Sequence, residues 1–456
     1  MDSKKKKTDV RALALDTLVD MDRNQKLSHV AIGDTLIRHQ FMARQDRAFY
    51  THLCEGVTER RITLDYMLDS LSGTPMRKCK PLIRNLLRMG AYQILYMQVP
   101  DAAACNEAAS LAKKRGFRNL AGFVNGVLRN LSRKKEEIPL PDRESEPVRY
   151  LSVKYSMPEW IVSLFTRQYG EEVCEKILAA CLEVRPVTIR TNLSRISPEG
   201  LKARLEEEKV RVEEAPYLPY AFAIYDYNYL GKIPSFKEGL FAVQDVSSML
   251  PVSVADIRED DLILDLCAAP GGKTFHAADL LGPKGKIISR DLTEFKIDYI
   301  KENKERMHYN QVEIQQWDAC VPDPELFGKA DLVIADLPCS GLGIMGRKND
   351  IKYHADPSRI KDLVILQRKI LEQAWRYLKP GGQLIYSTCT INEEENVDNV
   401  SWMTEHTPLR PVSIEERLPE ELRGRTGKDG YLQLIPGIDR CDGFFFAKLL
   451  NTNVNE

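Results

Sequence analysis

The chain of 456 residues is long enough for two or three domains, each with its own apolar interior. Hydrophobic residues make up 43% and charged residues 29%, and no apolar run approaches the roughly 20 residues that span a bilayer, which excludes a membrane protein. The formal net charge of -1 provides no overall positive field for a polyanion, so any nucleic acid would have to bind local basic patches.

The N-terminus and the cysteines indicate a cytoplasmic protein without a metal centre. The opening MDSKKKKTDV is charged but is not followed by the apolar segment of a secretory signal. The ten cysteines are scattered, and none forms a C-x-x-C pair. We therefore expect reduced thiols and neither a zinc site nor a disulfide framework. No obligate protein partner is evident from the sequence.

Residues 1–140 are predicted to form an all-α bundle. Between Val10 and Ser132, apolar residues recur at three- and four-residue spacing without strand-like alternation. Asp46 is a candidate N-cap for one helix, and another helix is expected to begin near Asn106.

Short basic runs in this bundle are candidate contacts for RNA phosphates. They are Lys4–Lys7, Arg77–Lys80 with Arg84 and Arg88, and Lys113–Arg115 with Arg118. A charge run is, however, more often a solvated face.

The stretch 133–149 is charged and contains prolines, so it is interpreted as a linker. Residues 145–235 are predicted to form a small α+β module that binds RNA or links the larger domains. Its signals are a helix start at Met157-Pro158, strand-like alternation over residues 186–191, and Ser197 as an N-cap before proline.

Residues 236–450 are predicted to form a Rossmann-like α/β domain. Short apolar strands alternate there with helices, which is typical of a doubly wound sheet. The expected strands are 262–266, 286–289, 332–335 and 383–386. In such sheets, ligands bind at the carboxyl ends of the strands.

The first of these strands leads into a loop of small residues, Cys267-Ala268-Ala269-Pro270-Gly271-Gly272-Lys273. Small residues allow a close approach of the backbone to a ligand. Asp291 and Asp318, at the next two strand ends, could accept hydrogen bonds from ribose hydroxyls and from an adenine amine. Because the loop lacks the phosphate-binding spacings, a ligand without pyrophosphate fits best. S-adenosylmethionine is such a ligand, with Lys273 available for its carboxylate.

Cys339 and Cys389 follow two later strands, beside turn residues. A thiolate at either position could add to carbon 6 of a cytosine, which makes carbon 5 nucleophilic enough to accept a methyl group. Asp336 could bind the protonated N3 and the amino group of that base, or it could only cap the following turn. Cys54, Cys105, Cys174, Cys181 and Cys320 are expected to be small buried side chains. Packing under the cofactor loop is sufficient to account for Cys267.

Several motifs resemble the RNA cytosine-5 methyltransferases of the Sun/Nop family. They are DLCAAPGGKT at 265–274, DLPCSGLG at 336–343 and YSTCT at 386–390. Two N-terminal segments, NEAASLAKKRG at 106–116 and GFVNGVLRN at 122–130, resemble the NusB fold, an RNA-binding bundle attached to one branch of that family. The resemblance covers nearly the whole chain.

The resemblance implies S-adenosylmethionine-dependent methylation of carbon 5 of a cytosine in 16S rRNA or a small-subunit precursor. It makes Cys389 the nucleophile, whereas Cys339 assists release of the enzyme from the methylated base. The residues implied to surround the cofactor and the base are the loop 267–273, Asp291, Asp318 and Asp336. Two alternatives remain: the same chemistry on tRNA or 23S rRNA, and a noncatalytic RNA-binding assembly factor, which the presence of both cysteines disfavours.

Overall fold

The computed structural model describes residues 9–453, which divide into two compact units. Unit 1 comprises the described residues up to Leu182 together with Arg347–His354, and unit 2 comprises the remainder. The chain therefore leaves unit 2 after Gly346 and returns to it at Ala355. Within residues 9–453, no helix combines the length and apolar character needed to cross a membrane. The domain limits expected from the sequence stay predictions.

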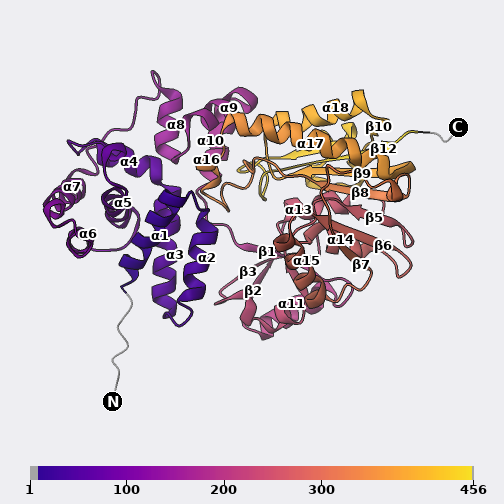
Figure 1. The fold of residues 1–456 in the computed structure, drawn as a ribbon, viewed down its shortest axis with the longest axis horizontal. Helices are drawn as coiled ribbons and strands as arrows, with labels where there is room; N and C mark the ends of the chain where they lie inside the picture. The colour runs from indigo at the N-terminus through magenta and orange to yellow at the C-terminus, as the bar shows by residue number, and fades with distance from the viewer. Residues whose placement is uncertain (1–8, 454–456) are drawn as a thin grey trace, which may run out of the picture. The chain divides into compact units, whose positions relative to one another are not determined.

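Unit 1 consists of helices, which confirms the predicted all-α region (Figure 1). The helices are α1 (Val10–Asn24), α2 (Ser28–Arg38), α3 (Arg44–Glu59), α4 (Arg61–Asp69), α5 (Pro81–Tyr96), α6 (Asp101–Lys114), α7 (Ala121–Lys134), α8 (Pro147–Tyr155), α9 (Glu159–Tyr169), α10 (Glu171–Ala180) and the short α16 (Ile351–His354). Helix α5 packs against α1, α3, α4, α6 and α7, so its apolar residues form the centre of the bundle.

Two predicted helix starts are wrong. Helix α3 begins at Arg44, with Ala43 at the N-cap. Asp46 therefore lies in the first turn, where its negative charge interacts favourably with the positive end of the helix dipole. Helix α6 begins at Asp101, one turn before Asn106, because an acid directly after a proline already favours a helix start.

Two arginines of one predicted basic run, Arg84 and Arg88, form ion pairs inside the bundle. Arg88 is only 4% exposed and donates two hydrogen bonds of 2.7 Å to the carboxylate of Asp65. Arg84 donates to Asp22 at 3.1 Å. These two arginines therefore stabilise the bundle through internal ion pairs. The run Lys4–Lys7 lies outside the described residues.

Unit 2 begins with a small α+β module built on a four-stranded antiparallel sheet of order β2-β3-β1-β4. Its elements are β1 (Val187–Thr191), α11 (Pro198–Glu207), β2 (Arg211–Glu214), β3 (Ala221–Tyr225), α12 (Pro234–Lys237) and β4 (Phe241–Val243). Ser197 caps α11 as predicted, because its hydroxyl accepts from the Gly200 N–H at 3.1 Å.

The rest of unit 2 is a mixed eight-stranded sheet of order β10-β12-β9-β8-β5-β6-β7, with β11 paired to β12. Strands β5 to β9 are mutually parallel, whereas β10, β11 and β12 form antiparallel pairs. The elements are α13 (Val246–Ser253), β5 (Leu262–Asp265), α14 (Gly272–Leu280), β6 (Lys286–Asp291), α15 (Glu294–Met307), β7 (Val312–Gln316), β8 (Ala330–Asp336), α17 (Pro357–Tyr377), β9 (Leu378–Thr388), α18 (Val397–His406), β10 (Leu409–Pro411), β11 (Tyr431–Leu434) and β12 (Phe444–Asn451).

Helices cover both faces of this sheet (Figure 1). In β5, Ile263 packs into the apolar layer that contains Phe275 of α14 and Ile297 of α15. The next residue, Leu264, packs into the opposite layer with Ile370 of α17. The alternation of side chains along a strand thus buries both faces, so the strands form a rigid platform. Strand order reverses between β5 and β8, which is where such sheets bind ligands.

Candidate active site

The loop after β5 is fastened to the end of β6. The backbone N–H of Ala269 donates to Asp291 at 3.0 Å, and the same carboxylate accepts from the Leu292 N–H at 2.8 Å and from Lys296 at 3.0 Å. A carboxylate has about four acceptor positions, so Asp291 retains capacity for about one further donor. Gly271 has a φ of 103° and touches Phe275, which leaves no space for a larger residue.

Asp265, the last residue of β5, is a further acid beside this loop. It was not among the site residues predicted from the sequence. It is fully buried and accepts a hydrogen bond from Thr274 at 2.6 Å through one oxygen. Its other oxygen, Oδ1, has no hydrogen-bond partner. Burial raises the pKa of Asp265 to about 7.

The buried Asp265 should make stability depend on pH. Because its folded-state pKa is raised from 3.8 to about 7, the folded protein holds this proton over an interval in which the unfolded chain releases it. The free energy of unfolding should therefore fall as pH rises through that interval, by at most about 4 kcal/mol from this group. Urea unfolding at about pH 5 and about pH 8 should show a smaller fall for Asp265→Asn. Equal falls in both proteins would contradict the assignment.

Asp318 lies one strand further along, just after β7. The intervening Trp317 donates its backbone N–H to the carbonyl of Asp291 at 3.0 Å, so the strand end that carries Asp318 stays paired with β6. Asp318 is exposed and accepts from the Cys320 N–H at 2.9 Å. The sheet thus holds Asp291 and Asp318 at the ends of neighbouring strands.

Asp336, at the end of β8, is held by side chains from two other elements, α14 and β9. Lys273 donates to one carboxylate oxygen at 2.6 Å and also to the hydroxyl of Ser248 at 2.8 Å. Ser387 donates to the other oxygen of Asp336 at 2.8 Å. Because these partners are side chains and not N–H groups of the following turn, turn capping does not account for Asp336. The Lys273–Asp336 pair is not predicted from the sequence, from which Lys273 is expected only as a partner for the cofactor carboxylate.

The two candidate cysteines meet beside Asp336. Their strands, β8 and β9, are parallel neighbours in which Asp336 is paired with Ser387, and the two Sγ atoms are 3.1 Å apart. At that distance one thiol can donate a hydrogen bond to the other sulfur. Contact with Cys389 and burial raise the pKa of the Cys339 thiol well above its ordinary value. A raised pKa favours the protonated thiol at Cys339.

A buried carboxylate supports the loop that carries Cys339. Both the N–H and the hydroxyl of Ser340 donate to Glu395, at 2.8 and 2.5 Å, and Gln367 of α17 donates to the same carboxylate at 3.1 Å. Glu395 is fully buried, and burial raises its pKa. The sequence gives no signal for it, because Glu395 ends the acidic run 393–395, which looks like a solvated surface.

Gly343 joins the two cysteine loops by direct backbone packing. Its N–H donates to the carbonyl of Cys389 at 3.1 Å, and its carbonyl accepts from the Gly443 N–H at 2.9 Å. A Cβ at this position would lie 2.1 Å from the carbonyl oxygen of Gly443. Only glycine therefore permits this close approach.

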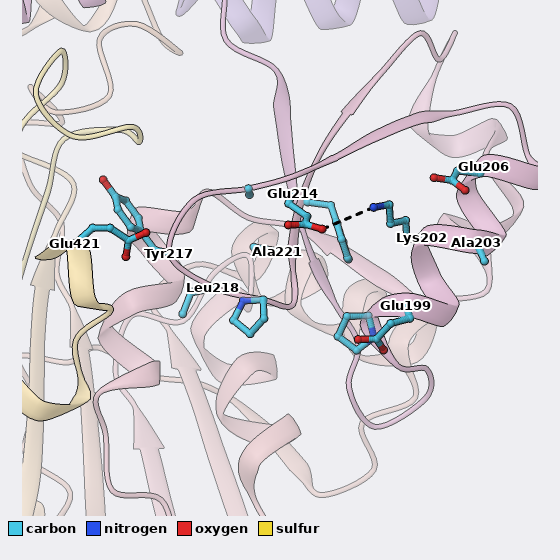
Figure 2. Close-up of a pocket in the computed structure, with 13 residues that line it drawn as sticks. Glu199, Lys202, Ala203, Glu206, Glu214, Tyr217, Leu218, Ala221 and Glu421 are labelled. Carbon is cyan, nitrogen blue, oxygen red and sulfur yellow. Dashed lines mark ion pairs between the residues drawn. The ribbon is translucent and has the colours of Figure 1, made fainter.

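A separate hollow of about 590 Å³ in the α+β module does not fit an anion (Figure 2). Glu199, Glu206, Glu214 and Glu421 line it, and its one lysine, Lys202, lies 3.7 Å from Glu214 (Figure 2). The excess of carboxylates would repel RNA phosphates. The strand ends of the larger sheet remain the candidate active site.

Comparison with known protein families assigns all three parts of the chain. Residues 252–450 match the family described as 16S rRNA methyltransferase RsmB/F, and residues 8–133 match the NusB family. Residues 157–227 match the ferredoxin-like domain of RsmF/B-like methyltransferases. A probable ribosomal RNA small subunit methyltransferase B from Bacillus subtilis is 36% identical over 448 residues, which cover 97% of this chain and 99% of that protein.

The chain belongs to the RsmB/F family of rRNA methyltransferases. A second relative, ribosomal RNA small subunit methyltransferase B from Salmonella arizonae, is 31% identical over 98% of this chain and 99% of its own length. The RsmB/F assignment confirms the predicted methyltransferase with an N-terminal NusB region and a C-terminal catalytic domain. The predicted α+β middle module is identified more closely as a ferredoxin-like domain.

Solved structures share this fold. The crystal structure of PH0851 matches with a TM-score of 0.80 and 25% identity, and covers 97% of this chain and 100% of that one. The crystal structure of NSun6 from Pyrococcus horikoshii with SFG matches with a TM-score of 0.59 and 24% identity, over 65% of this chain and 99% of that one. The match to NSun6 shows a shared fold only.

Proposed function

We propose that this RsmB/F-family protein methylates carbon 5 of a cytosine in 16S rRNA, in the cytoplasm, with S-adenosylmethionine as methyl donor. The observation that carries the proposal is the 3.1 Å contact between the sulfur atoms of Cys339 and Cys389 beside Asp336. The names of the relatives, small subunit methyltransferases, support the 16S target.

The residues at the strand ends suit S-adenosylmethionine, which supplies an electrophilic methyl group. The proposed cofactor residues are the loop 267–273, Asp291, Asp318 and Asp336. Asp291 has capacity for about one ribose hydroxyl, and the exposed Asp318 can accept from the adenine amine.

In the proposed reaction, the thiolate of Cys389 adds to carbon 6 of the cytosine. This addition turns the ring into an enamine whose carbon 5 is nucleophilic. Asp336 binds the protonated N3 and the amino group of the base, which stabilises the electron-rich adduct. Lys273 and Ser387 hold Asp336 in place for that contact.

Release then requires loss of the carbon 5 proton and expulsion of the Cys389 sulfur, which restores the double bond between carbons 5 and 6. The Cys339 thiol is within donating distance of that departing sulfur. Burial and contact with Cys389 raise the pKa of the Cys339 thiol, which favours its protonated form as the donor. In the roles that the family resemblance implies, Cys389 attacks and Cys339 assists release.

The purified full chain can be tested on 16S rRNA, 23S rRNA and tRNA with labelled S-adenosylmethionine. We expect label in 16S rRNA only, and bisulfite sequencing should locate it at a protected cytosine. Label confined to tRNA or 23S rRNA would contradict the target, and label on another base would contradict the chemistry. No transfer to any of them would favour the noncatalytic assembly factor.

Replacing Asp291 with alanine should weaken S-adenosylmethionine binding by about 1.5 to 3 kcal/mol, because a hydrogen bond to a charged acceptor is lost. Calorimetric titration measures the change. Asp298→Ala is a matched control, because that aspartate is exposed on α15 and pairs only loosely with Lys301, at 3.4 Å. An unchanged dissociation constant for Asp291→Ala would remove Asp291 from the site.

A further inference from the structure

An eight-residue segment of the catalytic region belongs to unit 1. We call Arg347–His354 the anchor segment. It follows the loop that carries Cys339 and precedes α17, both of which are parts of unit 2. Three of its residues, Asp350, Lys352 and Tyr353, contact the helical bundle.

Asp350 of the anchor segment caps helix α2. That helix begins at Ser28 with Leu27 at the N-cap, and Leu27 makes no side-chain capping bond. The Ser28 N–H instead donates to the carboxylate of Asp350, at 2.5 Å. Asp350 is 2% exposed, and its carboxylate lies at the positive end of the helix dipole and 4.0 Å from the ring of His354.

Lys352 has the opposite role at the end of helix α3. This helix ends at Glu59 and has no basic residue in its last turn. Lys352 donates to the Glu59 carbonyl at 2.8 Å, and it is 2% exposed. A cation at this position interacts favourably with the negative end of the helix dipole. Burial lowers the pKa of Lys352 to about 8.

Tyr353 adds a third contact between the anchor segment and the bundle. The guanidinium of Arg61 lies over its ring, 4.4 Å from the centroid. The anchor segment thus contacts the bundle at the start of α2, at the end of α3 and at the start of α4. The acid and the base each occupy the helix end that favours their charge.

Both ends of the anchor segment lead directly to the elements that hold the two cysteines. Gly343, which is fixed to the Cys389 carbonyl, precedes Asp350 by seven residues, a span of at most about 25 Å. After the segment, α17 supplies Gln367, which donates to the Pro338 carbonyl at 2.9 Å. The anchor segment is therefore joined to the Cys339 loop by only a few residues, so that fixing the segment limits the positions that the loop can take.

We propose that the helical bundle positions the loop 336–346 through the anchor segment, with Asp350 and Lys352 as positioning residues for methyl transfer. The inference rests on the proposed function, and it gives the bundle a role in turnover in addition to RNA capture. Without the two caps, the loop is free at one end and the Cys339–Cys389 geometry is less often formed.

The first test uses the full chain without RNA. In the double variant Asp350→Ala/Lys352→Ala, the alkylation rates of Cys339 and Cys389 by iodoacetamide, followed peptide by peptide, should rise severalfold. Lys348→Ala is the matched control, because Lys348 lies exposed in the same segment. Asp350→Asn keeps an acceptor for the Ser28 N–H, so its two cysteines should be alkylated at the same rates as those of the parent. Unchanged alkylation rates in a folded double variant would overturn the proposal. If the double variant does not fold, the same measurement is made on Asp350→Ala alone.

The second test separates turnover from RNA capture. We expect the turnover rate of the double variant on 16S rRNA to fall by about 10- to 100-fold, with its RNA dissociation constant within about twofold of the parent. A loss of RNA affinity with normal turnover would overturn the inference. If the parent protein methylates no RNA, the proposed function fails, but the alkylation rates still decide whether the anchor segment orders the loop.

Discussion

Replacing Cys389 with alanine should reduce methyl transfer to background, by about 10⁴-fold or more, because removal of a covalent nucleophile eliminates the step on which the others depend. Binding of S-adenosylmethionine should be unchanged, since the thiolate activates the base and does not hold the methyl donor. Labelled methyl transfer to 16S rRNA and calorimetric titration of the cofactor measure the two effects.

Cys79→Ala is a suitable control, because Cys79 is a partly exposed thiol in unit 1. It should methylate RNA normally. The roles of the two active-site cysteines would be reversed if Cys389→Ala turned over normally while Cys339→Ala was inactive.

Replacing Cys339 with alanine should have a different result: the enzyme should become trapped on its RNA. Cys389 can still attack, but the departing sulfur no longer receives a proton from the thiol 3.1 Å away. The adduct should therefore accumulate as a slow band on a denaturing gel, in the presence of RNA and S-adenosylmethionine.

The double variant Cys339→Ala/Cys389→Ala decides what the band contains. It should form no complex, because neither sulfur is available to attack. A complex that persists in the double variant, or that appears with Cys389→Ala alone, would show that the nucleophile is another residue.

The order of strands and helices could be predicted from the sequence because period and composition are local properties. The expected strand 262–266 corresponds to β5, and the alternation at residues 186–191 corresponds to β1. Helix starts were less certain. Asp46 and Asn106 are local start signals, but each helix begins earlier, at Arg44 and Asp101. Neither start has a side-chain capping bond, so no capping residue marks it in the sequence.

The candidate site was predictable where it depends on strand ends. Asp291, Asp336 and the two cysteines follow strands whose parallel order brings them to one edge of the sheet. The supporting contacts were not predictable. Lys273 reaches Asp336 across 63 residues, and Glu395 reaches Ser340 across 55, so no local pattern encodes either pair.

The anchor segment also affects how this protein can be divided. The chain crosses between the two units three times, after Leu182, after Gly346 and after His354. A gene fragment that ends at Leu182 would encode helices α2 and α3 without Asp350 and Lys352. The reverse fragment would carry these buried charges without the helix ends that stabilise them. Recombination at a single breakpoint therefore cannot exchange unit 1 intact, and a chimera that keeps both helix contacts would need the residues up to Leu182 and Arg347–His354 from the same parent.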